Sequence, residues 1–584
     1  MILQSLYEYY VRKEADSELN GQSSLTPSGW ERKEIPFILV IDSSGQLVSI
    51  EDQRDENGKR AKAYLVPQAI KKTSAIAANL FWDNPEYVLG YVAEGKKAER
   101  IHEQHQAFIQ KIRDFFPNHH TDIGIEALLN FLIHDPLTQA MALAEWKNIE
   151  KASKSNLSFR LSTDTLLICQ RPIVMSLMDT NNKTEATDAI KGHCLVTGEY
   201  STIARLHPAI KGVFGTQTAG GNIVSFNLDA FRFYRKHQGN NAPISEKATE
   251  TYTKALNYLL RRESQQKTLM GDGTTLVWWA EQPEARQIEE DFWLLFVERD
   301  NPDKRSEAIR SLLKSPWNGS QYSDSENTKF FILGLAPNAA RIAIRFFRVA
   351  TVTEFGKNIS AYFKEIALPH FEETSFPSIS SLCAAINDLD RLPANFQGRL
   401  FESIISGTPY PKLLFHSALH RIRATRFVTH NAAAILKACL IRNFPNSNYH
   451  REVLMTLQED NRDIGYVLGQ LFSIYDKLKE EETDGRANRR DKFFSALSTR
   501  PCAVISRLEH LSQCDLKKLR RSKETRGLAI TREKQIQKAM SKLAGPIPPT
   551  LSVEQQAMFA LGYYHQRQDF FTSKTKPTDQ EDAA

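Results

Sequence analysis

The sequence has few cysteines, and their spacing predicts neither a zinc site nor a disulfide framework. Six cysteines are spread over 584 residues without a Cys-x-x-Cys pair, which is typical of reduced thiols in a cytoplasm. Long apolar runs are missing as well, since no stretch approaches the ~20 residues of a membrane helix. The opening stretch MILQSLYEYYVRK lacks the apolar core of a signal peptide. We therefore expect a cytoplasmic protein with no membrane segment.

An excess of charge of one sign is also absent. The 75 basic and 69 acidic residues leave a formal net charge of +6, which is too small for a protein that attracts nucleic acid through its overall field. Any contact with nucleic acid must therefore come from local patches. With 41% apolar residues, the chain has ample material for several hydrophobic cores.

Signatures of catalysis and of cofactor binding are missing too. The stretch GYVAEGKK nearly spells a nucleotide-binding P-loop, but Lys97 occupies the position of the hydroxyl that holds magnesium. His102 and His105 have no further ligand at the spacing of a metal site. We expect no catalytic residue, no metal and no cofactor. A nuclease or RNA-processing enzyme, which would need such a cluster, and a purely structural scaffold are the alternatives.

The pattern of apolar residues predicts an α+β fold. Residues 36–50 predict a hairpin around Ser-Ser-Gly, and residues 329–355 predict two strands around an Ala-Pro-Asn turn. Helical spacing dominates from Lys96 to Lys154 and again after Pro369. The expected domains are a mixed domain with antiparallel sheets and helical insertions at 1–368, a helical connecting region at 369–454, and an all-α helical bundle at 455–584.

The stretch from Gly212 to Leu259 carries the most information about function. It begins GVFGTQTAGGNIVSFN, in which glycines alternate with uncharged hydrogen-bonding side chains, and a short strand is expected at 223–226. Residues 231–237 then interleave aromatic rings with cations. Cations neutralise phosphate, rings stack on bases and a glycine loop can enter a groove, so this mixture favours nucleic-acid binding. A glycine-rich hairpin beside an amphipathic helix is the alternative interpretation.

A pair of lysines nearer the start of the chain forms a second basic segment. Lys71 and Lys72 precede Thr73 and Ser74, and Asn79 follows. Cations beside hydroxyls suit a phosphate, although a solvated turn has the same composition.

The second of the two strands predicted at 329–355 carries several arginines. In a regular strand, alternate residues share a face. We therefore expect Arg341 and Arg345 on one face, opposite a face made of Ile342, Ile344 and Phe346. Such a cationic sheet face can contact phosphate or simply face solvent.

The segment from Lys517 to Lys542 is the most basic part of the chain. Ten cations stand against only Glu524 and Glu533, so the local balance is +8. Such a patch suits sequence-independent contact with a phosphate backbone, and a solvated helix face is the alternative. The ten cations are Lys517, Lys518, Arg520, Arg521, Lys523, Arg526, Arg532, Lys534, Lys538 and Lys542.

Several motifs along the chain resemble, in the same order, one known protein family. They are DNPEYVLG at 83–90, the run from Gly192 to Leu260, LGLAPNAAR at 333–341 and QAMFALGYYHQR at 556–567. Together with the start MILQSLYEYY, they are similar to the large subunit of the type I-C CRISPR surveillance complex (Cascade), the Csd family. The resemblance covers nearly the full length of the chain.

The resemblance implies an RNA-guided function without an enzymatic step of the chain's own. Such a subunit recognises the motif that flanks the target (PAM) in double-stranded DNA, promotes R-loop formation, stabilises the displaced strand and helps to recruit a helicase-nuclease. Its partners would be CRISPR RNA, target DNA, the backbone and five-prime-end subunits, and small subunits. The C-terminal bundle of the family is similar to the small subunit, and Met455 is a candidate internal start.

The resemblance also suggests which residues make contact. The residues expected to bind DNA and the flanking motif are Lys71, Lys72, Thr73, Ser74, Asn79, Lys211, Gln217, Thr218, Gly220, Gly221 and Asn222. Among these, the glycines and Asn222 would form the inspecting loop, and Gln217 is the candidate wedge. The residues expected to bind the displaced strand or the backbone are Arg232, Arg235, Lys236, Lys517, Lys518, Arg520, Arg521, Lys523, Arg526, Lys534 and Lys538.

Overall fold

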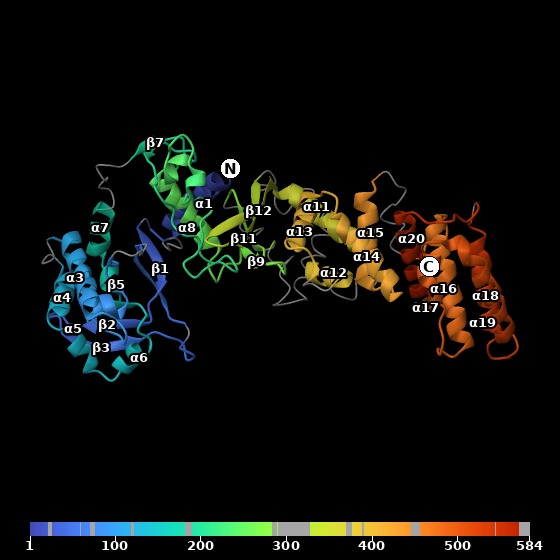
Figure 1. Ribbon diagram of the computed structural model, residues 1–584, viewed down its shortest axis with the longest axis horizontal. Coiled ribbons are helices and arrows are strands. Elements are labelled where there is room, and N and C mark those ends of the chain that lie inside the picture. Colours follow the sequence, from blue (N-terminus) through green and yellow to red (C-terminus); the bar gives the residue numbers. More distant parts are fainter. Residues whose placement is uncertain are drawn as a thin grey trace, which may run out of the picture. The chain divides into compact units, whose positions relative to one another are not determined.

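The structure, a computed structural model, consists of two compact units assembled from interleaved segments (Figure 1). The first unit contains Met1–Tyr9, Pro208–Ser225 and Ala255–Ala584, and the second contains Tyr10–His207 and Phe226–Lys254. The domain boundaries predicted after 368 and 454 both fall within the first unit. The described residues are 1–20, 26–27, 29–58, 60–70, 76–117, 122–181, 190–282, 289, 292, 328–368, 376–387, 391–445, 456–543 and 545–571.

The second unit is built on a four-stranded sheet with the order β3-β2-β6-β5. The predicted hairpin is confirmed as β2 (Phe37–Ile41) and β3 (Leu47–Asp52), and all five residues of β2 are buried. Strand β6 (Leu157–Leu161) pairs in parallel with β2, and the short β5 (Trp82–Asp83) pairs with β6. The predicted helices follow as α3 (Ala98–Phe115), α4 (Ile123–Ile133), α5 (Pro136–Met141) and α6 (Trp146–Lys151). They share one apolar core with the sheet.

Smaller elements complete the second unit. Strand β1 (Trp30–Glu34) pairs with β4 (Ala63–Pro67), and β7 (Lys191–His193) pairs with β8 (Tyr200–Thr202). The helices are α2 (Pro85–Val88) and α7 (Pro172–Asn181). Two helices lie across the division between the units, namely α1 (Ile2–Asn20) and α8 (Glu246–Leu259).

The first unit contains an antiparallel sheet with the order β12-β11-β10-β9. The two predicted strands are confirmed as β11 (Lys329–Asn338) and β12 (Arg341–Thr351), and they are joined to β10 (Thr275–Ala280) and β9 (Lys267–Leu269). One face packs against α11 (Val352–Ile366) and α13 (Phe396–Ser406). On the other face, Trp279 stacks on Phe331 at 5.3 Å between ring centroids, and Tyr9 packs beside it.

The prediction that Ile342, Ile344 and Phe346 share one face of β12 is wrong. The register shifts between Gly334 and Leu335, so Phe346 pairs with Gly334 whereas Ile344 pairs with Leu335. Adjacent residues of β11 point to opposite faces, and the irregularity therefore turns Phe346 into the helical core. Ile344 is left 40% exposed. The sequence pattern alone could not reveal one extra residue in the strand.

The described part of the chain after residue 376 is helical, as the spacing of apolar residues predicted. The further helices are α12 (Ile379–Ile386), α14 (Lys412–Thr425), α15 (His430–Asn443), α16 (Ile464–Glu482), α17 (Arg490–Leu497), α18 (Ile505–Leu519), α19 (Arg526–Met540) and α20 (Val553–Asp569). Together with the antiparallel sheets, these helices confirm the α+β class. Within the described ranges, no helix is both long and apolar enough to cross a membrane.

Helices α16 and α20 cross at a distance that only glycine permits. A Cβ atom on Gly465, Gly469 or Gly562 would lie within 3.0 Å of a backbone carbonyl oxygen of the other helix. Tyr563 Oη on α20 also donates a hydrogen bond of 3.0 Å to the fully buried Asp476 on α16. The closing motif of the sequence therefore holds the bundle together.

We expect the glycine contact to dominate the stability of the bundle. Gly469→Ala should lower the free energy of unfolding by about 2–3 kcal/mol, because backbone atoms cannot move aside for the new methyl group. The control is Gly527→Ala on α19, where a Cβ atom meets nothing within 4 Å and the change should be neutral or stabilising by about 0.5–1 kcal/mol. Urea unfolding of both variants measures the difference, and equal stabilities would contradict the role of the crossing.

Candidate nucleic-acid interface

The glycine-rich segment lies against the tip of the β11–β12 hairpin in the first unit. Ile210 and Gly221 exchange two backbone hydrogen bonds of 2.8 and 2.9 Å, which close the loop between them. The next residue, Asn222, forms a parallel bridge with Arg341, and Ile342 donates its N–H to the Asn222 carbonyl at 3.0 Å. The loop is therefore a rigid extension of the sheet rather than a free hairpin.

The two glycines at the end of the loop let the backbone pass close to neighbouring residues. Gly220 has a φ of +87°, and a Cβ atom there would lie 2.5 Å from the Ile210 carbonyl oxygen. A Cβ atom on Gly221 would lie 3.0 Å from a side-chain carbon of Ile342. Residues with side chains rarely adopt the angle at Gly220, and at Gly221 a side chain would have to push Ile342 aside. The sequence predicted these glycines as part of the inspecting loop, and the structure gives each a role in shaping it.

The tip of the loop presents polar side chains to solvent. Gln217, Thr218 and Ala219 are exposed. A tight turn supports them, because Gly220 donates its N–H to the Gln217 carbonyl at 2.8 Å. Lys211 is exposed at the other end of the loop, and its N–H binds the Asn257 side chain at 2.8 Å.

Asn222 is half-buried and its side chain has a structural partner. Its Nδ2 donates a hydrogen bond of 2.9 Å to the Pro208 carbonyl, which ties the two ends of the segment together. The strand expected at 223–226 does not form, since strand pairing stops at Asn222. Gln217 is therefore better placed than Asn222 to reach a ligand.

The segment predicted to bind the flanking duplex belongs to the second unit. Lys71, Lys72, Thr73 and Ser74 lie outside the described residues, but the residues beside them are described. Asn79 is only 4% exposed, and its Oδ1 accepts a 3.0 Å hydrogen bond from the Ile70 N–H. Asn79 thus joins the two ends of the intervening segment.

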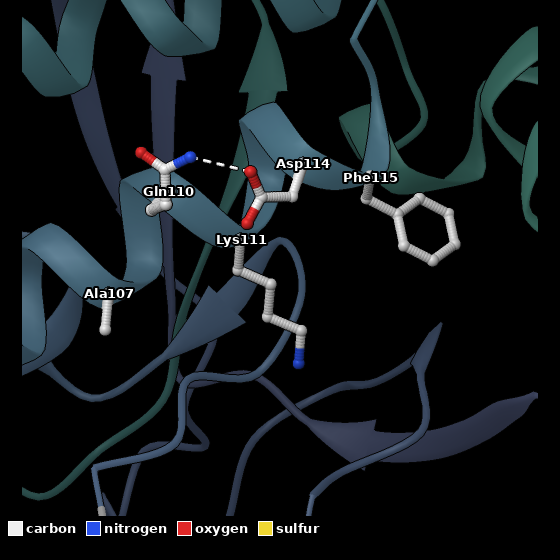
Figure 2. A pocket seen from close by; sticks show the side chains of 5 residues that line it. All are labelled: Ala107, Gln110, Lys111, Asp114 and Phe115. Carbon is white, nitrogen blue, oxygen red and sulfur yellow. Dashed lines mark hydrogen bonds between the residues drawn. The ribbon is translucent and has the colours of Figure 1, made fainter. Parts of the chain in front are cut away.

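Helix α3 contacts the chain just before Asn79. Lys111 Nζ donates a 2.6 Å hydrogen bond to the Ala78 carbonyl. Figure 2 shows that Lys111 points away from the hydrogen-bonded pair of Gln110 and Asp114, at a hollow that Ala107 and Phe115 also line. Sequence reasoning missed Lys111, because nothing in its helical context distinguishes it from other surface lysines.

The aromatic and basic segment at 231–237 lies in the second unit and is largely exposed. Lys236 donates its N–H to the Phe233 carbonyl at 2.8 Å, which closes a turn with Tyr234 and Arg235 at its centre. Both central residues have positive φ angles, +48° and +59°. Left-handed conformations of residues other than glycine cost about 1–3 kcal/mol each and concentrate at functional sites. The turn therefore stores strain that the sequence pattern did not reveal.

The basic segment from Lys517 to Lys542 has fewer available cations than its composition suggested. Ion pairs join Lys518 to Glu482, Arg520 to Glu533, Arg532 to Glu481 and Lys538 to Glu459. Lys542 binds the Gln470 side chain, and its desolvation lowers the pKa of the ammonium group. Among the described residues of this segment, five cations have no ion pair or hydrogen bond through their side chains, and we name these five the α18–α19 patch: Lys517, Arg521, Lys523, Arg526 and Lys534.

A half-buried histidine lies at the end of the first segment of the second unit. His207 Nδ1 lies 2.6 Å from the Tyr252 hydroxyl on α8. Burial lowers the pKa of His207 to about 4 from a usual value of 6.5. The imidazole is therefore neutral at physiological pH. Its hydrogen bond to Tyr252 fixes the chain shortly before the glycine-rich segment, which begins at Gly212.

Comparison with known protein families identifies the family of the chain. The model of the family described as CRISPR-associated protein (Cas_Csd1) matches residues 6–571. No curated protein matches the chain. The match spans both units and includes the glycine-rich loop, the strained turn and the α18–α19 patch.

The α18–α19 patch should contribute to non-specific binding through its unpaired cations. We expect Arg521→Gln with Lys534→Gln to weaken binding of single-stranded DNA and to reduce the slope of log K against log salt by about 1.4, since each neutralised phosphate contributes about 0.7. The matched control is Arg520→Gln with Lys538→Gln, whose cations are already paired with carboxylates. A salt titration measures both slopes. Equal reductions would show that the ion pairs do not determine which cations bind.

His207 should make stability depend on pH in a defined window. In the folded chain the pKa is about 4, and in the unfolded chain it is 6.5, so protonation favours unfolding between these values. The contribution of His207 is complete above pH 6.5 and declines as the pH falls towards 4. The midpoint of thermal unfolding of His207→Asn should therefore fall less over this range than that of the native chain. The exposed His134→Asn serves as control and should follow the native chain.

Proposed function

The chain belongs to the Cas_Csd1 family of CRISPR-associated proteins, and we propose that it is the large subunit of a Cascade-type surveillance complex. In this role it recognises the motif flanking a target in double-stranded DNA and promotes opening of the duplex. The observation that carries the proposal is the exposed polar turn at Gln217 and Thr218, held rigidly by glycine contacts and by the bridge to β12.

A rigid loop with uncharged polar side chains suits inspection of a groove. Glutamine and threonine both donate and accept hydrogen bonds, so they can match acceptors and donors on base edges. A side chain inserted between base pairs also unstacks them, at a cost of a few kcal/mol per step. A flexible loop would bend instead of separating the base pairs. The backbone hydrogen bonds between Ile210 and Gly221 resist such bending.

The cations of both units support a division of labour. Contacts to phosphate fix the position of a protein on DNA, whereas contacts to base edges provide specificity. Lys71, Lys72, Thr73 and Ser74 together with Lys211 would hold the flanking duplex, and Gln217 would test the bases. The α18–α19 patch would hold the displaced strand after opening.

The remaining specificity in this proposal comes from base pairing between a guide RNA and the target strand, with the protein reading only the flank and the shape of the duplex. The partners are then CRISPR RNA, the backbone and five-prime-end subunits, small subunits and a recruited helicase-nuclease, all in the cytoplasm. Cleavage belongs to the recruited enzyme in this arrangement, and the chain itself carries out no catalytic step.

Binding to a matched duplex with a native or a scrambled flank tests the proposal. The complex assembled with its guide RNA should prefer the native flank at fixed salt, and Gln217→Ala should reduce the preference by about 5-fold to 100-fold, the usual effect of one lost base contact. The control is Gln46→Ala, which removes an exposed glutamine from the β2–β3 turn and should leave the preference unchanged. Equal binding of both flanks by the native complex would refute recognition of the flank.

A further inference from the structure

We infer that the turn from Phe233 to Lys236 is a binding site for single-stranded DNA, in which Tyr234 stacks on an unpaired base. The inference rests on the proposed function, because opening of a target duplex is the event that would supply unpaired bases beside this chain. It concerns the second unit alone and does not involve the glycine-rich loop.

The two rings of the turn are unusually accessible. Tyr234 is 94% exposed and Phe233 is 66% exposed. Among the large apolar side chains of the described residues, none is more exposed than Tyr234. A ring with this exposure contacts almost nothing in its own chain, so both of its faces are open to a ligand. Burial of the ring therefore does not explain its presence.

The turn is nevertheless held in a single conformation. Asn241 accepts a 2.9 Å hydrogen bond from the Phe233 N–H and donates hydrogen bonds to the carbonyls of Lys236 and Gln238. Gly239 fixes the neighbouring chain, since its N–H binds the Arg205 carbonyl at 3.0 Å. These hydrogen bonds fix the backbone that carries the Tyr234 ring, so a base that stacks on the ring does not have to order the turn first.

The backbone of the turn disfavours the residues that occupy it. Turns with two left-handed central residues prefer Asn-Gly or Gly-Gly, because side chains are strained there. Tyr234 and Arg235 stand in these positions instead. Folding alone would favour glycine at position 234, so the ring is better explained by a contact with a ligand than by the stability of the chain.

The charges beside the rings indicate the chemistry of this ligand. Arg235 and Lys236 are exposed, and neither side chain has a partner among the described residues, whereas Arg232 is paired with Asp229 at 2.8 Å. Rings beside cations match the bases and the phosphates of a single strand. Bases of an intact duplex are stacked on each other and offer no free face, which favours single-stranded over double-stranded DNA.

Fluorescence anisotropy of the full chain with labelled single-stranded oligothymidine, at fixed salt, tests the site. Tyr234→Ala and Tyr234→Gly should each weaken binding about tenfold, within the effect of one lost base stack, whereas Tyr234→Phe should stay within about twofold. The matched control is Tyr200→Ala. This residue is 65% exposed on β8, where its ring contacts His193, and its loss should leave binding unchanged.

Glycine at position 234 separates the function of the ring from the folding of the turn. Glycine relieves the strain, so the midpoint of thermal unfolding of Tyr234→Gly should equal or exceed that of the native chain. Binding that is as tight as that of the native chain would overturn the inference. Weakened binding combined with a lowered unfolding midpoint would also overturn it, because the ring would then serve the fold.

A crosslinking experiment locates the contact. An oligonucleotide with 5-iodo-deoxyuridine should crosslink to Tyr234 or Phe233 on irradiation, as identified by mass spectrometry, and crosslinks confined to other residues would overturn the inference.

Failure of the stacking site can be distinguished from failure of flank recognition. A complex that keeps its preference for the native flank while Tyr234→Gly binds single strands normally would refute only the stacking site, and loss of flank preference in the native complex would refute the proposed function.

Discussion

The candidate recognition loop depends on backbones that approach each other more closely than side chains allow. Gly220 passes beside the carbonyl of Ile210, and Gly221 passes beside Ile342 at the start of β12. These contacts let a loop from the middle of the chain join β12, a strand that begins more than one hundred residues later. Without these contacts, Gln217 and Thr218 would lie on a loop that does not hold their side chains in fixed positions for a ligand. The same constraint governs the bundle, where Gly465, Gly469 and Gly562 bring α16 and α20 into backbone contact.

The polar features of the chain differ in what they do for the fold. Asn79, Asn222 and Asn241 each use the side chain to tie a loop to itself, and each lies beside residues that we propose to contact nucleic acid. Their amides are thus better described as positioning groups than as contacts. The cations behave in the same selective way, because carboxylates from α16 and from the turn at Glu459 neutralise several lysines and arginines of the 517–542 segment. The cations of the α18–α19 patch remain free. So few charges suit transient contact with phosphate rather than attraction of nucleic acid through a broad electrostatic field.

The strained turn at Tyr234 and the half-buried His207 show how differently two unusual residues can be explained. His207 is a neutral partner of Tyr252, and its lowered pKa follows from desolvation. Tyr234 has no such internal partner in its turn, and its backbone is less stable with tyrosine than with glycine. The first residue serves the fold, whereas the second requires something outside the chain.

The sequence by itself determined the α+β class, the β2–β3 and β11–β12 hairpins and the helical last third, because these follow from local periodicity. It also identified the family through motifs in a fixed order, and it indicated the glycine-rich and basic segments as candidates. It could not place the bulge that turns Phe346 inward, since one extra residue leaves no mark in the apolar pattern. Nor could it tell free cations from paired ones or find the strain at Tyr234. Those features were decided by the tertiary structure, because they depend on which distant carboxylates, carbonyls and strands come to lie beside each residue when the chain folds.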